Sequence, residues 1–353
     1  MPMRMRRRPR EPETVLLSGR DLAKPASRAR KEAETAKMTE KATAKGEIAM
    51  NAPEVSREAR KPLLGPHDFL RLIRSCAHTV VRNAFGAPPM IPRASELERH
   101  SPGDLGLTRF IPAIHNLLGD LTDADQNSRE ATKPEASTRF SRYAENLHEA
   151  FLAKKDGSLV FYDKDALGAP RKTAHTAEML LEEAGSASFL FSGRKRVLVA
   201  VPLLHSFGFV FGLLAPRLAR LPAIDAEPAP DLRGYPLRKG DLLVLFPQLL
   251  MKLTLVPPAD VSLLSSSSPP LDDALFKAAG NIGYLSLAEV YGTSLSGALG
   301  FRKGKGPYEL FSHFDRLGEK SVKRKSTGGI LTSHRLVWRR ERHFGRRDSE
   351  PVG

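Results

Sequence analysis

The region from residue 197 to residue 302 most limits how this chain can fold, because short apolar runs alternate there with small and polar residues. The segments concerned are Val197–Pro202, Leu242–Phe246, Ser262–Ser268 and Glu289–Ser294. This alternation is typical of buried parallel strands whose carboxyl ends open onto a ligand site. We therefore expect an α/β fold of mostly parallel sheets flanked by helices, with a site at the carboxyl edge.

Length and cysteine content set broad bounds on the class of protein. The 353 residues suffice for one large domain or two smaller ones with a substantial core. The single cysteine, Cys76, excludes an intrachain disulfide. The segment Met1–Arg10 is rich in arginine and no apolar stretch follows it, so we expect no signal peptide and predict a cytoplasmic location.

The formal net charge of +15 is concentrated at the two ends of the chain. Residues 1–60 carry +6 and residues 301–353 carry +8, which leaves only +1 for the middle. No zinc-finger spacing or aromatic RNA-binding pattern accompanies this charge. The distribution favours solvated basic flanks over a specific nucleic-acid module, and a basic-tailed polyanion binder stays open as an alternative.

The first 157 residues are expected to form a tail and a helical lead-in. Residues 1–60 contain few large apolar groups and are predicted to be a disordered basic tail. Apolar spacing predicts helices over 68–85 and 111–121, and a polar loop over 122–138. A third amphipathic helix is expected to bury Tyr143, Leu147 and Phe151.

From residue 158 onward, strand, turn and helix recur, which predicts βα units and a largely parallel sheet. After a first strand over 158–162 we expect a polar turn and then a helix over 176–184. The later units pair Arg196–Pro202 with Phe207–Leu218, and Val261–Leu264 with Leu271–Ala279.

One apolar stretch admits a competing interpretation. Val197–Pro216 contains 20 residues without a charge, which is long enough to cross a membrane. Pro202, His205 and Gly208 interrupt it, so the pattern favours strand, turn and helix over a membrane span.

Five short motifs also follow one another in order: Gly168–Thr176 with Leu180 and Glu183, Val201–Gly208, Ser266–Leu271, Glu289–Ser294 and Gly345–Ser349. In this order they resemble the motifs of the adenylate-forming acyl/aryl-acid ligases, a superfamily that contains acyl-CoA synthetases. The resemblance covers residues 158–353. Each motif alone is weak, but the order and spacing together make the resemblance moderately specific.

The resemblance implies the fold of that superfamily's large N-terminal domain. Residues 61–344 would form this domain, with a helical lead-in over 61–157 and a motif-bearing α/β core over 158–302. Residues 345–353 would be a remnant of the hinge, and the small C-terminal domain that carries the family's catalytic lysine would be absent.

The resemblance also implies a nucleotide site and a set of catalytic residues. The nucleotide-binding positions would be Gly168, Pro170, Arg171 and Lys172 at the phosphates, Ser266, Ser267 and Ser268 beside adenine, Tyr291 stacked on the adenine ring, Gly292 at the close backbone approach, and Arg346 and Asp348 at the hinge. The catalytic positions would be Thr293 and Ser294 as donors to the α-phosphate and His205 in the acyl pocket.

The implied reaction is ATP-dependent activation of a small carboxylic acid as an acyl-adenylate, followed by transfer to a thiol of CoA or a carrier protein. Attack of a carboxylate on the α-phosphorus brings two anions together, so catalysis would come from preorganised donors and Mg²⁺. ATP and Mg²⁺ are therefore the implied cofactors, and no specific nucleic-acid partner is expected.

Several positions depart from the family pattern. Asp163–Leu167 replaces the hydroxyl-rich phosphate loop, and Leu295 occupies the position of the glutamate that binds Mg²⁺. A leucine cannot bind magnesium. Thr332–His334 has a histidine where the family has the ribose-binding aspartate, and Asp315 is a poorer substitute. These changes predict impaired activity in this chain alone.

Whether the chain is an enzyme is therefore left open by the sequence. A noncatalytic relative, acting as a partner or regulatory subunit or with a separate lid-domain protein, is the main alternative. The site residues also have plain structural interpretations: His205 as a turn histidine, Ser265–Ser268 as a low-complexity turn, and Tyr291 as a half-buried aromatic residue at a strand end.

Overall fold

The computed structural model describes residues 63–86, 91–154, 157–164, 170–226, 232, 235–253, 256–258, 260–267, 271–293, 295–304, 306–318 and 321–332. The predicted basic tail over 1–60 and the hinge over 345–353 lie outside the described residues. All structural statements below concern the described ranges.

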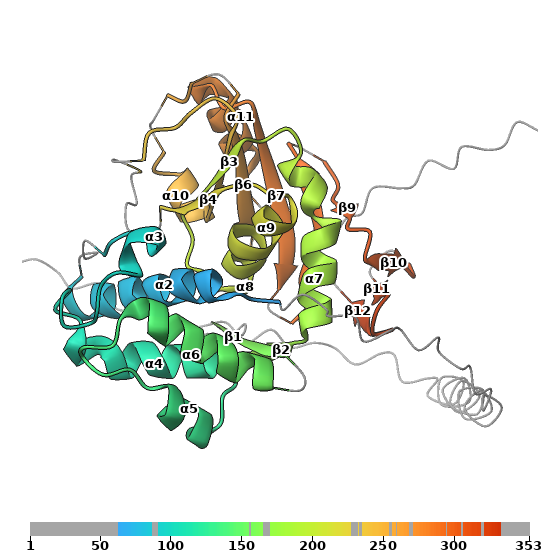
Figure 1. The fold of residues 1–353 in the computed structure, drawn as a ribbon. Helices are drawn as coiled ribbons and strands as arrows, with labels where there is room; N and C mark the ends of the chain where they lie inside the picture. Colours follow the sequence, from blue (N-terminus) through green and yellow to red (C-terminus); the bar gives the residue numbers. More distant parts are fainter. Residues whose placement is uncertain are drawn as a thin grey trace, which may run out of the picture. The chain divides into compact units, whose positions relative to one another are not determined.

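A group of helices forms the N-terminal part of the described chain (Figure 1). Its elements are α2 (Pro66–Phe85), α3 (Ala94–Leu97), the 3₁₀-helix η1 (Thr108–Phe110), α4 (Ile111–Leu121), α5 (Gln126–Thr132) and α6 (Phe140–Ala153). Helix α2 packs against both α4 and α6. The three amphipathic helices expected from apolar spacing are confirmed, and Phe69, Ile114 and Tyr143 on their inner faces are fully buried.

The prediction of a loop over 122–138 is wrong in its middle, where α5 forms. Asp125 precedes this helix and its carboxylate accepts a hydrogen bond of 2.7 Å from the backbone N–H of Ser128. Such an N-cap stabilises a helix start by about 1 kcal/mol. The polar composition of the segment did not indicate this short helix, which begins after a capping residue.

The main sheet has seven strands in the order β4-β3-β5-β6-β7-β8-β9. The strands are β3 (Arg196–Val199), β4 (Ala223–Asp225), β5 (Asp241–Leu245), β6 (Ser262–Ser267), β7 (Ser286–Thr293), β8 (Gly297–Lys303) and β9 (Glu309–Leu310). Pairing is parallel from β4 through β7, whereas β8 and β9 add in antiparallel register. The predicted α/β class with a mostly parallel sheet is confirmed.

Side chains along the strands alternate between two hydrophobic cores, as expected for a sheet covered on both faces. Val197 and Val199 of β3 join the core that includes α2 and α6, and Leu198 joins a second core on the opposite face. Both cores are almost completely buried, which explains why the apolar residues of β3 and β5 follow one another without a break in the sequence.

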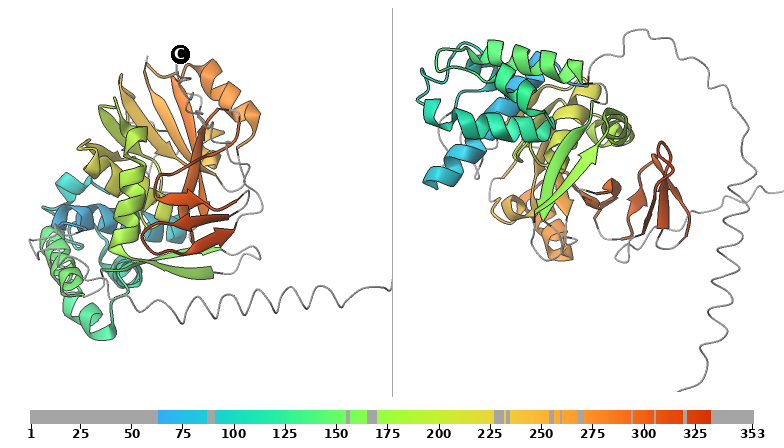
Figure 2. Two further views of the ribbon diagram at one scale, coloured as in Figure 1. Left: turned by 90° about the vertical axis from the view of Figure 1, so that its right-hand side faces the viewer. Right: turned by 90° about the horizontal axis from the view of Figure 1, so that it is seen from below.

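Helices connect the parallel strands and cover the sheet (Figures 1 and 2). They are α7 (Ala177–Ser186), the 3₁₀-helix η2 (Ser188–Phe191), α8 (Ser206–Gly208), the π-helix η3 (Phe209–Leu214), α9 (Ala215–Leu218), α10 (Pro247–Leu250) and α11 (Asp273–Ile282). The stretch Val197–Pro216 thus divides into β3, a turn and three short consecutive helical elements. Within the described ranges, no helix combines the length and apolar character that a membrane span needs.

Two small sheets accompany the main one. Strands β1 (Leu159–Lys164) and β2 (Pro170–His175) form an antiparallel pair, and β10 (Phe314–Arg316), β11 (Ser321–Arg324) and β12 (Ile330–Thr332) form a three-stranded antiparallel sheet. The polar turn expected before α7 is therefore partly wrong. Thr173 and His175 of β2 are buried, so the segment forms a strand with one inward face despite its polar composition.

Candidate functional site

A small pocket lies at the carboxyl ends of two parallel strands of the main sheet. Its lining includes Ser266 at the end of β6, Gly292 and Thr293 at the end of β7, and His205 just before α8. The pocket has a volume of about 60 Å³. Open α/β sheets commonly bind ligands at this edge. Four predicted site residues from three separate motifs therefore meet at one place.

The lining differs in burial between its outer and inner parts. Thr293 is exposed, and Ser266, Gly292 and His205 are partly exposed, so they form the mouth. The buried part is mainly apolar and contains Phe207, Phe211, Val290, Ala298 and one acidic residue, Glu183. The pocket lining is thus mainly polar where it is exposed and mainly apolar where it is buried, and Glu183 lies against Gly297, the register partner of Thr293.

A tight approach between β7 and β8 shapes the mouth. The register of this strand pair shifts between Tyr291 and Gly292, and Gly292 then pairs with Ala298. A Cβ atom added at Gly292 would lie 2.1 Å from the backbone oxygen of Gly297 and 2.8 Å from Cα of Ala298. Glycine is therefore required here by the close approach of two backbones.

The replacement Gly292→Ala is expected to destabilise the protein by about 1–3 kcal/mol, because the methyl group has only backbone atoms to displace. Gly280→Ala is the matched control. Gly280 is exposed in α11 with open space around the added methyl group, and alanine should stabilise that helix by up to about 1 kcal/mol. Urea denaturation of the two variants measures the difference. Equal effects of the two changes would contradict the close approach.

A turn after β7 fixes the hydroxyl group of Thr293. The backbone N–H of Thr293 donates to Oγ of Ser296 at 3.0 Å, and the backbone N–H of Ser296 donates to Oγ1 of Thr293 at 3.1 Å. The two hydroxyl groups also lie 3.0 Å apart. This reciprocal arrangement holds a hydroxyl and a backbone amide at the mouth in one geometry.

Glu183 of α7 is held inside the pocket by one hydrogen bond. Its Oε1 accepts from the backbone N–H of Ala298 at 2.9 Å, and a Cβ added at Gly297 would lie 2.1 Å from Oε2. Gly297, at a φ of 65°, therefore provides the space that the carboxyl group occupies. Burial raises the pKa of Glu183 to about 7, although the Ala298 hydrogen bond and the nearby charge of Arg324 act in the opposite direction.

His205 is held in place at the start of α8. Its Nδ1 accepts a hydrogen bond of 3.2 Å from the backbone N–H of Phe207, and its ring packs edge-on against Phe246 with 5.1 Å between ring centroids. The imidazole therefore both caps a short helix and lines the pocket. It is a turn histidine and a pocket residue at the same time.

A buried ion pair between β7 and β8 holds Leu271, the first described residue after β6, in place. Glu289 of β7 is fully buried, and its Oε2 accepts from Nε of Arg302 at 2.5 Å. Its Oε1 accepts from the backbone N–H of Leu271 at 2.7 Å, and Nη2 of Arg302 donates to the Leu271 carbonyl at 2.8 Å. The backbone N–H of Leu271 is thus bonded to β7, and its carbonyl oxygen is bonded to β8. Leu271 ends the motif that begins at Ser266 in the pocket.

The structure does not bring Tyr291 to this pocket. Tyr291 lies on the face of β7 opposite Val290 and Gly292, is only 7% exposed, and packs against Tyr308 with 5.4 Å between ring centroids. The predicted adenine-stacking role needs an exposed ring, and strand alternation places this ring in a separate small core.

The predicted phosphate-binding residues also lie apart from the pocket lining. Pro170, Arg171 and Lys172 form the start of strand β2, not a loop. Lys172 is exposed and donates a 2.9 Å hydrogen bond to Asp123, which raises the pKa of its ammonium group. This carboxylate competes with any phosphate for the lysine.

Five predicted residues lie outside the described residues: Gly168, Ser268, Ser294, Arg346 and Asp348. Ser267 is described only through its backbone, at the end of β6. Glu183 belongs to the first motif, but the sequence analysis did not select it as a site residue. Glu183 lies three residues after the buried Leu180, so helical spacing puts its carboxyl group on the inward face of α7. A carboxyl group on an inward face indicates a functional or paired residue.

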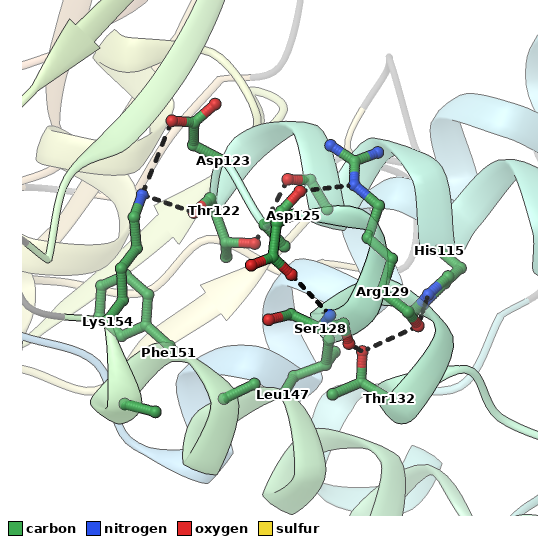
Figure 3. Close-up of a pocket in the computed structure, with 14 residues that line it drawn as sticks. His115, Thr122, Asp123, Asp125, Ser128, Arg129, Thr132, Leu147, Phe151 and Lys154 are labelled. Atoms are coloured by element: carbon green, nitrogen blue, oxygen red, sulfur yellow. Dashed lines mark hydrogen bonds and ion pairs between the residues drawn. The ribbon is translucent and has the colours of Figure 1, made fainter.

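A second pocket, of about 230 Å³, lies among α4, α5 and α6 (Figure 3). Its charged groups are already engaged: Nζ of Lys154 donates to the Thr122 carbonyl at 2.9 Å, and Asp125 caps α5. His115 bridges Tyr143 and the Arg129 carbonyl at 2.8 and 2.7 Å. These contacts hold the helices together, so this pocket is the weaker candidate.

The chain is similar to two curated proteins named 4-coumarate–CoA ligase. The protein from Halorhodospira halophila is 26% identical over 217 residues, which cover 59% of this chain and 54% of the relative. The protein from Rhodobacter capsulatus is 32% identical over 155 residues, which cover 42% of this chain and 40% of the relative. The chain thus spans about half the length of the curated relatives it matches. No protein-family model matches it.

These matches confirm the relationship that the motif order indicated: the chain is related to the adenylate-forming acyl-CoA ligases. Among solved structures, an AMP-forming acyl-CoA synthetase-like protein from Dyadobacter fermentans aligns with a TM-score of 0.42 and 14% identity, over 55% of this chain and 60% of that one. That likeness is too low to carry any argument about the site.

Proposed function

We propose that this chain binds ATP and a carboxylic acid at the pocket between β6, β7 and α8 and activates the acid as its acyl-adenylate. The single observation that supports this most strongly is the meeting of Ser266, Gly292, Thr293 and His205, which come from three motifs of the family. Transfer of the acyl group to a thiol of CoA or a carrier protein would follow.

The polar mouth suits the anionic part of an adenylate. The Thr293 hydroxyl would donate to the α-phosphate, where charge develops during carboxylate attack. The two hydrogen bonds between Thr293 and Ser296 already hold the Thr293 hydroxyl in position. Little reorganisation is therefore needed when the phosphate binds.

The apolar base suits an aromatic acid. The rings of Phe207 and Phe211 pack against each other, with 4.9 Å between their centroids, and supply an apolar wall. The two relatives are named for 4-coumarate, an aromatic acid, which supports the same substrate class for this chain. We therefore propose an arylalkenoic or related aromatic acid as the substrate.

The described residues do not fit a magnesium ion held by the protein. No group of three candidate metal ligands occurs in the described ranges, and Leu295 in the turn after β7 offers no oxygen. This position favours the second candidate function, in which the chain binds the adenylate but does not form it, as a noncatalytic subunit working with a separate lid-domain protein.

Exchange of labelled pyrophosphate into ATP in the presence of 4-coumarate distinguishes the two functions. We expect acid-dependent exchange by the wild-type chain, and about a 10²-fold loss in Thr293→Val, which keeps the side-chain shape but removes one phosphate donor. Binding of ATP and acid by calorimetry without exchange would favour the noncatalytic subunit. Absence of both binding and exchange would reject both functions.

A further inference from the structure

A buried arginine, Arg324 of β11, contacts the turn that carries the Thr293 hydroxyl. Arg324 is only 2% exposed. Its Nη2 donates a buried hydrogen bond of 2.6 Å to the backbone carbonyl of Ser296. Ser296 in turn bonds to Thr293 through both its Oγ and its backbone N–H. A single residue, Ser296, therefore separates the guanidinium group from the hydroxyl at the mouth of the pocket.

Two further contacts fix the orientation of the Arg324 guanidinium group. Its Nη1 forms an ion pair of 3.3 Å with Oε2 of Glu182 on α7. Its central carbon lies 4.8 Å from the centroid of the Phe314 ring on β10. Oε2 of Glu182 also accepts from Oγ of Ser326 at 2.6 Å, so the carboxylate is held as well. Because a guanidinium group is planar and rigid, these contacts keep its Nη2 directed at Ser296.

Burial makes the bond between Arg324 and Ser296 important for the turn. A hydrogen bond from a charged donor is about twice as strong as one between neutral groups. Ser296 is 5% exposed, so water can replace the guanidinium group at its carbonyl only if the turn moves. The turn also packs closely on Arg324, since a Cβ added at Gly297 would lie 3.2 Å from Nη2. The position of the turn therefore depends on Arg324.

We propose that Arg324 is a positioning residue for the acyl-adenylate reaction. By bonding to Ser296, it keeps the Thr293 hydroxyl where that hydroxyl donates to the α-phosphate. The inference rests on the proposed function, because it takes Thr293 to be the phosphate donor. Arg324 itself touches neither the acid nor the nucleotide. Without Arg324, the hydrogen bonds between Thr293 and Ser296 open more often, and the hydroxyl spends less time in the reactive orientation.

The preceding residue of β11, Lys323, provides a matched control. Lys323 is exposed, and successive side chains of a strand point to opposite faces. Lys323→Met therefore removes a positive charge from the same strand, but from the face directed away from Ser296. Arg324→Met removes the charge and the hydrogen bond together.

Hydrogen exchange of single backbone amides, measured on the full chain without ligand, tests the effect on the turn. We expect the amides of Thr293 and Ser296 to exchange about 10- to 100-fold faster in Arg324→Met, the factor that a hydrogen bond from a charged donor supplies. Lys323→Met should keep the wild-type rates. A loss of global stability alone would speed the slow amides of β5 and β6, not those of a turn that opens locally.

Pyrophosphate exchange with 4-coumarate tests the consequence for the reaction. Arg324→Met should lower kcat about 10-fold and leave KM for the acid within about 2-fold, because the weakened contact is made in the transition state. The double variant Thr293→Val with Arg324→Met should have the kcat of Thr293→Val alone, because Arg324 acts through that hydroxyl. A merely structural role would give losses that add.

Unchanged exchange of the Thr293 and Ser296 amides in Arg324→Met, or additive losses of kcat in the double variant, would overturn the role of Arg324 and leave the proposed function intact. If the methionine variant does not fold, Arg324→Lys decides by the same measurements. Its single ammonium nitrogen replaces the two nitrogens that bond to Ser296 and Glu182, so its effects should be smaller but in the same direction. Absence of pyrophosphate exchange by the wild-type chain would reject the proposed reaction and this inference together.

Discussion

Glu289→Ala is expected to lower the free energy of unfolding by about 3–5 kcal/mol, the largest effect that we predict for a single substitution. Glu289 is fully buried, and Arg302, its partner at 2.5 Å, is only 13% exposed. Removing the carboxylate leaves a guanidinium group buried without an oppositely charged partner and leaves the Leu271 amide without its acceptor. Urea denaturation followed by circular dichroism measures this loss.

Two further variants separate the buried pair from ordinary surface charge. Glu145 forms an ion pair with Arg142 at 3.3 Å, but both side chains are about half exposed or more, so Glu145→Ala should cost less than about 1 kcal/mol. The double variant Glu289→Met with Arg302→Met should regain part of the stability lost in Glu289→Ala, because no unpaired charge remains. A loss in Glu289→Ala no larger than in Glu145→Ala would contradict the role of this pair.

The second large effect is a pH-dependent difference between the wild-type chain and Glu183→Gln. The pKa of Glu183 rises from 4.5 to about 7 in the folded chain, chiefly through burial. The folded state thus binds more protons than the unfolded state between these values, so the contribution of Glu183 to stability falls as pH rises from about 4.5 to about 7. The difference amounts to about 3 kcal/mol.

Denaturation of both chains at several pH values between 4.5 and 8 provides the measurement. His78 and His313 have pKa values lowered by burial to about 3, so they reduce stability as pH falls below their ordinary value of 6.5. Both chains contain these histidines, and taking the difference between the chains removes their contribution. If the free energies of unfolding of the two chains changed with pH by the same amount, the pKa of Glu183 would not be raised by folding. That result would contradict the prediction.

Much of the fold could be predicted because burial leaves a periodic pattern in the sequence. Helices α2, α4 and α6 bury residues at helical spacing, and β3, β5 and β6 are covered on both faces. The short helix α5 and the strand β2 were missed for physical reasons. Helix α5 depends on the Asp125 cap, and β2 is stabilised by pairing with β1, a contact that local composition does not encode.

The candidate site could be predicted only in part. Parallel strands end at a common edge, so the motifs that contain Ser266 and Gly292 were expected to meet, and both line the pocket. Tyr291 was expected at the same site, but the alternation of side chains along β7 places its ring on the opposite face of the strand. Strand alternation was available from the sequence and is a better guide to orientation there than motif resemblance.

The surroundings of Glu183 could be described only from the three-dimensional structure. Its carboxyl group is held by the backbone of β8, which is 115 residues away along the chain. The sequence places one acidic residue on an inward face of α7, but only the fold shows that this face borders the pocket.

A crystal structure of the full chain with a non-hydrolysable analogue of 4-coumaroyl-adenylate tests the central claim most directly. We predict that the phosphate mimic lies within hydrogen-bonding distance of Thr293 and that the aromatic ring lies against Phe207 or Phe211. Binding of the analogue at any other place, or no binding at saturating concentration, would contradict the assignment of this pocket as the acyl-adenylate site.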